Sequence, residues 1–214
     1  MDAKNNNDKQ LVIIGAGGHA KEVVWLARVC GWNIIGVLDD SAGQDAVAGV
    51  RVLGEVSLCT EYDECFFTIA VGDPRSRSQV ANKLEVCLPQ VRYATLIHPS
   101  VVLSESVSIG EGSVIAAGSV VSADVKIGKQ CILNINSSLS HEVVIADYCT
   151  IAPNAALAGN VTVEGLVEIG LGASVRQGLN LGAGSLLGMG AVLVRNLPSG
   201  VVYVGNPAIY LKDI

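Results

Sequence analysis

Residues 133–162 read LNINSS LSHEVV IADYCT IAPNAA LAGNVT, and this stretch decides the fold. It belongs to an unbroken run of seventeen hexads that begins at Ile97 and ends at the hexad opened by Leu193, and every hexad opens on Ile, Leu or Val. A period of six is neither helical nor a simple strand alternation, and it is typical of a parallel β-helix of hexapeptide repeats. In the left-handed form, three short strands close one triangular coil of about 18 residues. Residues 18 apart should then stack at the usual strand spacing of roughly 4.8 Å.

The composition divides the chain near residue 96. Only nine of the 214 residues are aromatic, and a single one of these, Tyr148, lies within the hexads. A stacked triangular prism has a thin interior that medium-sized aliphatic side chains fill. We therefore predict an α/β domain over residues 1–96 and a β-helix domain with a C-terminal tail over residues 97–214.

Charge and hydropathy exclude several classes of function. The net charge is −6 and no basic cluster occurs, which argues against a nucleic-acid partner. The first ten residues are polar and the longest apolar runs are strand-sized, so we expect neither a signal peptide nor a membrane span. The six cysteines have no metal-ligand or disulfide spacing, and Cys131 and Cys149 are expected to be core thiols. These features favour a cytoplasmic protein.

The first ninety-odd residues alternate between strand and helix patterns. Predicted strands cover 11–14, 33–38, 66–71 and 91–96, and predicted helices cover 19–30 and 74 to about 86. The second helix should begin at Pro74 with Asp73 as its N-cap. Such alternation predicts a small, Rossmann-like parallel sheet covered by helices.

Gly15, Gly17 and Ala20 match the G-x-G-x-x-[GA] pattern between a strand and a helix. Glycines there let a pyrophosphate approach the helix N-terminus. Three interpretations remain open: an NAD site, a tight turn without a ligand, and a site for the nucleotide of a larger substrate. The third is favoured, because about 95 residues supply only half of a doubly wound domain. His19 would then meet a phosphate, and Asp39 and Asp40 would lie beside the ribose or base edge.

His141 is the histidine of the hexads with the clearest chemical context. It is the third residue of its hexad, and Gly159 lies 18 residues later. Stacking would therefore place an imidazole beside a backbone amide that no side chain covers. A base next to an amide donor suits acyl transfer, since the base takes the proton of the nucleophile and the amide stabilises the oxyanion. Glu142 would hold the imidazole tautomer.

Two other interpretations of His141 compete with catalysis. It could be a surface histidine at a corner of the repeat. A zinc site would require several convergent histidines, but His98 lies 43 residues from His141 and does not stack with it, so no metal is predicted.

These motifs together resemble a known family, the bacterial nucleotide-activated 4-amino-sugar N-acetyltransferases and the related sialic acid O-acetyltransferases. The resemblance covers nearly the whole chain. It is carried by the following segments: the Gly-Ala-Gly-Gly-His turn at 15–19, Leu38-Asp39-Asp40, Ala70-Val71-Gly72-Asp73, Ile97-His98-Pro99, Ser140-His141-Glu142, Ala158-Gly159-Asn160 and Gly205-Asn206-Pro207-Ala208.

The resemblance implies a homotrimer with acetyl-CoA bound between neighbouring prisms. His141 would be the general base and Glu142 its partner. The nucleotide of the sugar would be held by Gly17, Gly18, His19, Asp39, Asp40 and Gly72, and the acetyl-CoA groove would be lined by Gly159, Leu171 and Met189. Relatives can carry a second histidine, nine residues after the base, that contacts the acetyl carbonyl. This chain has Thr150 there, whose hydroxyl could still donate a hydrogen bond to the cofactor.

The activity implied is transfer of an acetyl group from acetyl-CoA to the 4-amino group of a UDP- or dTDP-linked amino-deoxy sugar, in bacterial surface glycan (lipopolysaccharide or O-antigen) biosynthesis. Two alternatives are O-acetylation of a sialic acid or other sugar, and a non-catalytic β-helix that binds a nucleotide sugar.

Overall fold

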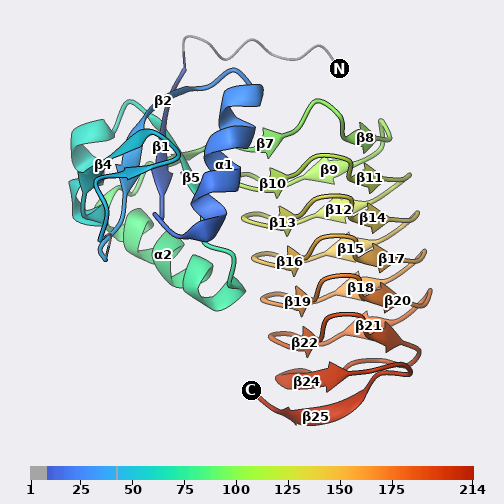
Figure 1. The fold of residues 1–214 in the computed structure, drawn as a ribbon. Coiled ribbons are helices and arrows are strands. Elements are labelled where there is room, and N and C mark those ends of the chain that lie inside the picture. The colour runs from blue at the N-terminus through green and yellow to red at the C-terminus, as the bar shows by residue number, and fades with distance from the viewer. Residues whose placement is uncertain (1–8, 42) are drawn as a thin grey trace.

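The computed structural model describes residues 9–41 and 43–214 of the chain, which form an α/β domain beside a three-sided prism (Figure 1). The α/β domain holds one six-stranded sheet in the order β3-β4-β2-β1-β5-β6, parallel except for the β3–β4 hairpin. Its elements are β1 (Gln10–Ile14), α1 (Gly18–Val29), β2 (Asn33–Leu38), β3 (Ala46–Val47), β4 (Val50–Gly54), the 3₁₀ helix η1 (Val56–Tyr62), β5 (Phe66–Ile69), α2 (Pro74–Cys87) and β6 (Arg92–Tyr93).

The sheet is covered on both faces because the side chains of β1 alternate between them. Leu11 and Ile13 pack with α1, whereas Val12 and Ile14 pack with α2 and η1. Asp73 caps α2 as predicted, and its carboxylate accepts a hydrogen bond from the Ser76 amide at 2.7 Å. The β3–β4 hairpin and η1 were not predicted, since their segment lacks a clear hydrophobic period.

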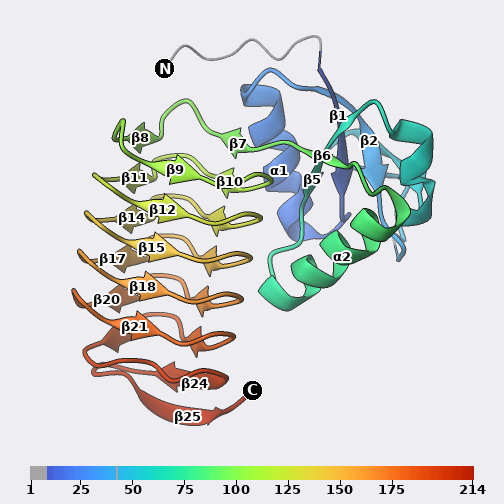
Figure 2. The ribbon, with the colours of Figure 1, turned by 180° about the vertical axis from the view of Figure 1, so that it is seen from behind.

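The prism is a left-handed β-helix of two-residue strands, and the predicted 18-residue stacking is confirmed (Figures 1 and 2). Its strands stack into three faces, and neighbouring strands within a face are parallel except for β24 and β25, which pair antiparallel. Face 1 contains β7 (Leu96–Ile97), β10 (Val114–Ile115), β13 (Ile132–Leu133), β16 (Thr150–Ile151), β19 (Glu168–Ile169), β22 (Leu186–Leu187), β24 (Val201–Val204) and β25 (Ile209–Asp213). Face 2 contains β8 (Val102–Leu103), β11 (Val120–Val121), β14 (Ser138–Leu139), β17 (Ala156–Leu157), β20 (Ser174–Val175) and β23 (Val192–Leu193). Face 3 contains β9 (Ser108–Ile109), β12 (Lys126–Ile127), β15 (Val144–Ile145), β18 (Thr162–Val163) and β21 (Asn180–Leu181).

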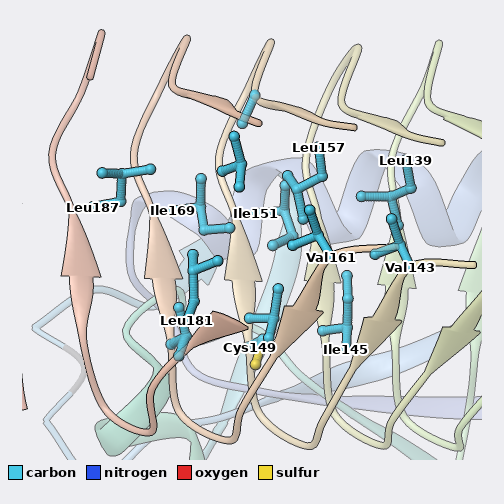
Figure 3. Close-up of a cluster of buried hydrophobic side chains, with 14 of the residues drawn as sticks. Leu139, Val143, Ile145, Cys149, Ile151, Leu157, Val161, Ile169, Leu181 and Leu187 are labelled. Atoms are coloured by element: carbon cyan, nitrogen blue, oxygen red, sulfur yellow. The ribbon is translucent and has the colours of Figure 1, made fainter. Parts of the chain in front are cut away.

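The hexad openers fill the prism core, as Figure 3 shows for Leu139, Ile145, Ile151 and Leu157. The fifth residues of the hexads point inward beside them. Cys149 is fully buried and its thiol donates to the Glu164 carbonyl at 3.0 Å, which confirms that it is a core thiol. Burial of this aliphatic stack is the main favourable term for the fold.

The turns at the three corners of the prism are set by the fourth residue of the hexads, which adopts the left-handed backbone conformation in every hexad from the one containing Gly112 to the one containing Gly190. Glycine fills many of these positions, but Glu142, Asn160 and Leu166 also do so, with φ of 59°, 57° and 63°. Corner 1–2 joins face 1 to face 2, corner 2–3 joins face 2 to face 3, and corner 3–1 returns to face 1.

The α/β domain packs against face 1 of its own prism (Figure 2). Val114 and Ile132 of this face are buried in the same hydrophobic cluster as α1. The predicted division at residue 96/97 stays a prediction, because β7 contains both residues. No helix within residues 9–41 and 43–214 is long and apolar enough to cross a membrane.

Candidate active site

His141 lies in the corner 2–3 turn, above Gly159 of the next coil. The coils stack in register here, because the Asn160 amide donates to the His141 carbonyl at 2.9 Å. A Cβ added to Gly159 would overlap Cε1 and Nε2 of the imidazole, so the ring rests directly on this glycine. The imidazole is 63% exposed. The prediction that His141 stacks on Gly159 is therefore confirmed.

Glu142 fixes the orientation of the imidazole. Its carboxylate oxygen Oε2 lies 3.0 Å from His141 Nδ1. A carboxylate can only accept, so Nδ1 is the donor, and in the neutral imidazole the lone pair is on Nε2. The left-handed conformation of Glu142 allows two adjacent side chains to meet in this way.

The Gly159 amide is available as a hydrogen-bond donor. Its carbonyl accepts from the Gly178 amide at 3.0 Å, but its own N–H has no partner among the residues that the structure describes. Gly159 is buried beneath the imidazole, and an unpaired amide beside a histidine base can stabilise a developing oxyanion.

The glycine-rich turn leaves an open surface at the N-terminus of α1. Gly15 has φ of 105°, and its amide donates to the Leu38 carbonyl at the end of β2 at 2.8 Å, so it holds the start of the turn beside the sheet. A Cβ built on Gly17, Gly18 or Gly72 would meet nothing within 4 Å. The α1 N-cap, Gly17, makes no side-chain capping bond, which leaves the helix N-terminus free to bind an anion.

His19 lies in the first turn of α1, beside this open surface. Burial lowers its pKa, and the Glu22 carboxylate, 3.1 Å from Nδ1, opposes that shift. Its Nε2 is buried without a partner among the residues described. A small pocket between α1 and the prism includes His19, Trp25, Asn134 and Ile135. Trp25 and Asn134 were missed from the sequence, because neither belongs to a recognisable motif.

The carboxylates of Asp39 and Asp40 interact with other residues of the same chain. The Asp39 carboxylate accepts from the Ala16 amide at 2.6 Å and from the Ser41 amide at 2.7 Å, so it supports the glycine turn. Asp40 accepts from the Val56 amide at 3.0 Å and pairs with Lys83. Their expected role beside a ribose or base therefore stays a prediction, and both carboxylates already have donors.

The expectation for Thr150 is corrected. Its side chain is 8% exposed, and its hydroxyl donates to the Gly72 carbonyl at 2.8 Å. The hydroxyl proton of Thr150 already has an acceptor in the chain, so it is not free to bind an acetyl carbonyl. The reason is that face 1 carries Thr150 beneath the α/β domain, away from corner 2–3.

Leu171 and Met189 stack at corner 1–2 and are exposed, at 53% and 79%. They lie 30 and 48 residues from His141, neither of which is a multiple of 18, so one chain does not bring them to corner 2–3. The α/β domain covers face 1 (Figure 1), whereas His141 lies between β14 and β15, at the opposite corner. Within a single chain, the glycine turn and His141 therefore lie on different sides of the prism. No cluster of three or more potential metal ligands occurs in residues 9–41 and 43–214.

The two-domain fold and the histidine at its corner define a hexapeptide-repeat acetyltransferase. Residues 10–84 match the PglD N-terminal domain family. The structure is similar to a variant of perosamine N-acetyltransferase from Caulobacter crescentus solved with CoA and GDP-perosamine. The TM-score is 0.90 and the identity 35%, over 95% of this chain and 97% of that one.

It is also similar to the acetyltransferase domain of PglB from Neisseria gonorrhoeae FA1090 in complex with acetyl coenzyme A. The TM-score is 0.88 and the identity 34%, over 95% and 99% of the two chains. UDP-N-acetylbacillosamine N-acetyltransferase of Bacillus subtilis (strain 168) is 36% identical over 114 residues, 51% of this chain and 52% of that protein, so the match spans about half the length of this curated relative. The chain thus belongs to the family of bacterial nucleotide-sugar N-acetyltransferases.

Proposed function

We propose that this protein transfers an acetyl group from acetyl-CoA to the 4-amino group of a nucleotide-linked amino-deoxy sugar, in the cytoplasmic steps of bacterial surface glycan synthesis. The observation that carries the proposal is the placement of the His141 imidazole on Gly159, with Glu142 bound to Nδ1. The relatives named above, one solved with CoA and GDP-perosamine and one with acetyl coenzyme A, support the same pair of substrates. UDP and dTDP remain the expected nucleotides, and GDP joins them as a candidate.

The proposed reaction is a direct transfer without an acyl-enzyme. The sugar amine attacks the thioester carbonyl while Nε2 of His141 accepts its proton. The Gly159 N–H supports the oxyanion until the carbon–sulfur bond breaks and coenzyme A leaves. Glu142 stabilises the imidazolium that forms. Cys131 and Cys149 are fully buried, so neither serves as a nucleophile.

The nucleotide would bind across the open surface at Gly17, Gly18 and Gly72. The uncapped N-terminus of α1 attracts the diphosphate through its free amides and its dipole. A bound diphosphate would favour the imidazolium form of His19, which takes its proton from solvent, and would add a charge-assisted bond to this site. The sugar would then extend from the α/β domain toward a histidine base.

We propose that this base comes from a neighbouring chain of a homotrimer. His141 lies at the corner opposite the face that carries its own α/β domain. A symmetric ring of three chains would bring the glycine turn of one chain to corner 2–3 of the next. Gly159 of one chain and Leu171 and Met189 of its neighbour would then line a shared acetyl-CoA groove.

The experiment compares acceptors. The purified chain is incubated with acetyl-CoA and either a UDP-, dTDP- or GDP-linked 4-amino sugar or a sialic acid, and coenzyme A release is measured. Release with an amino-sugar nucleotide supports the proposal. Release with the sialic acid alone would show O-acetylation instead, and fluorescence titration with NADH tests the dinucleotide interpretation.

His141→Ala tests whether His141 is the base. We expect the turnover number to fall at least about a hundredfold, the scale of general-base catalysis, while the oligomeric state is retained. His98→Ala is the matched control, because His98 lies at the start of the prism, where it stacks on Trp25. Turnover of His141→Ala close to that of the wild type would favour a non-catalytic scaffold.

A further inference from the structure

Arg77 is a buried cation at the junction of the two domains. It lies one turn into α2 and is 1% exposed. Within residues 9–41 and 43–214 it forms no ion pair with a carboxylate. Burial lowers its pKa, to about 10, and the guanidinium remains charged at neutral pH. A buried charge without a counter-ion is costly unless all of its donors are satisfied.

Every N–H group of Arg77 finds an oxygen. On the side of the α/β domain, Nη1 donates to the carbonyls of Val71 and Gly72, both at 2.8 Å. Toward the prism, Nε donates to the Gln130 carbonyl at 2.8 Å, and Nη2 donates to the carbonyls of Tyr148 and Cys149 at 2.9 and 3.1 Å. The side chain therefore joins the loop after β5 to corner 3–1 in two successive coils.

Thr150 completes this connection. Its hydroxyl accepts from Arg77 Nη2 at 3.0 Å and donates to the Gly72 carbonyl at 2.8 Å. The Gly72 carbonyl thus receives two hydrogen bonds, one from each residue. A hydroxyl can both donate and accept, which a valine of the same shape cannot do.

The loop that these bonds hold is one wall of the proposed nucleotide site. A Cβ on Gly15 would contact the Ala70 carbonyl and a methyl of Val71 at 3.2 Å, so the loop after β5 lies against the glycine turn. Gly72 itself faces open space. Movement of this loop would change the width of the site and its position relative to the prism.

We propose that Arg77 and Thr150 are positioning residues that hold the Gly72 loop, and with it the nucleotide of the sugar substrate, at a fixed place relative to the prism. This inference rests on the proposed function. Neither residue touches the reacting atoms. Their contribution is to the binding of the nucleotide and to the delivery of the sugar amine, and it leaves acetyl-CoA binding unaffected.

The test is Thr150→Val, with Thr162→Val as the matched control. Thr162 occupies the same hexad position on face 3 and is exposed. Calorimetric titration with UDP, dTDP and GDP gives the dissociation constant, and steady-state kinetics give KM for each substrate. We expect Thr150→Val to weaken nucleotide binding and raise KM for the nucleotide sugar about tenfold, the scale of a hydrogen bond to a charged group. KM for acetyl-CoA should stay within about twofold of the wild-type value, and Thr150→Ser should restore binding.

Three outcomes would overturn the inference: unchanged nucleotide binding in Thr150→Val, an equal loss in Thr162→Val, or an equal rise in KM for both substrates. A wild-type chain that binds a nucleoside diphosphate but acetylates no amino sugar would refute the proposed function, while the binding comparison still tests the two positioning residues. A wild-type chain that binds none of the three nucleotides would refute both.

Discussion

The chemistry of His141 depends on what surrounds its ring. Glu142 occupies Nδ1 on one side, and Gly159 leaves room for the imidazole by having no Cβ. The neutral ring therefore has its lone pair on Nε2, beside an amide whose N–H has no partner among the described residues. At this scale the glycine is as necessary as the base, because any side chain there would displace the ring.

Gly159→Ala should therefore reduce activity without destabilising the fold. The added methyl group would push the imidazole away from the amide, and a misplacement of about 1 Å can lower turnover by roughly ten- to hundredfold. The backbone at Gly159 is not in the left-handed region, so alanine introduces no strain. Gly165→Ala is the control, since its Cβ would make an ordinary 3.5 Å contact with the Asp147 carbonyl. Steady-state kinetics and thermal melting of both variants check this. Equal turnover in the two variants would contradict it.

At the scale of the element, the central coils of the prism are built from turns with a left-handed residue at the fourth position of the hexad. Asparagine and glycine adopt this conformation at little cost, whereas other L-residues are strained by about 1–2 kcal/mol. Leu166 is such a residue, with φ of 63° and a half-buried side chain.

Leu166→Asn should stabilise the fold by about 1 kcal/mol, because asparagine relieves this strain. For a chain of this size the melting temperature would rise by roughly 2–4 °C. The reverse change, Asn154→Leu, is the control, since Asn154 has φ of 59° at an exposed turn and should lose a similar amount. A lower melting temperature for Leu166→Asn would show that its side-chain contacts outweigh the backbone strain.

Across the whole molecule, the sequence predicted what is periodic and missed what is not. The hexad openers predicted the β-helix, and the 18-residue interval placed His141 on Gly159. Leu171 and His141 are not separated by a multiple of 18 residues, and they therefore lie at different corners of the prism. No period connects Arg77 to Thr150, because the docking of one domain on the other brings them together. The sequence suggested that Asp39 was available to bind a ligand, but its carboxylate accepts hydrogen bonds from backbone amides of nearby turns.

The separation of the glycine turn from His141 is the basis for our proposal that the site forms between chains of a trimer. In the proposed trimer, a nucleotide bound to one chain would reach the His141 of a neighbour, since the α/β domain covers face 1 of its own prism (Figure 2). Two inactive chains should therefore complement each other when one supplies the nucleotide site and the other supplies the base. Gly18→Glu would remove nucleotide binding, because it places a carboxylate where the diphosphate should bind. An acidic residue in the first helical turn also favours α1, so the fold is retained, and Gly18→Gln is the control.

Co-expression of His141→Ala and Gly18→Glu chains with different tags, followed by purification through both tags, gives trimers that contain both variants. Each such trimer pairs an intact nucleotide site with an intact base at about one of its three interfaces. We expect the mixed trimers to acetylate the amino-sugar nucleotide at about a third of the wild-type rate, while each variant alone is nearly inactive. Mixed trimers as inactive as the parent variants would contradict a catalytic centre shared between chains.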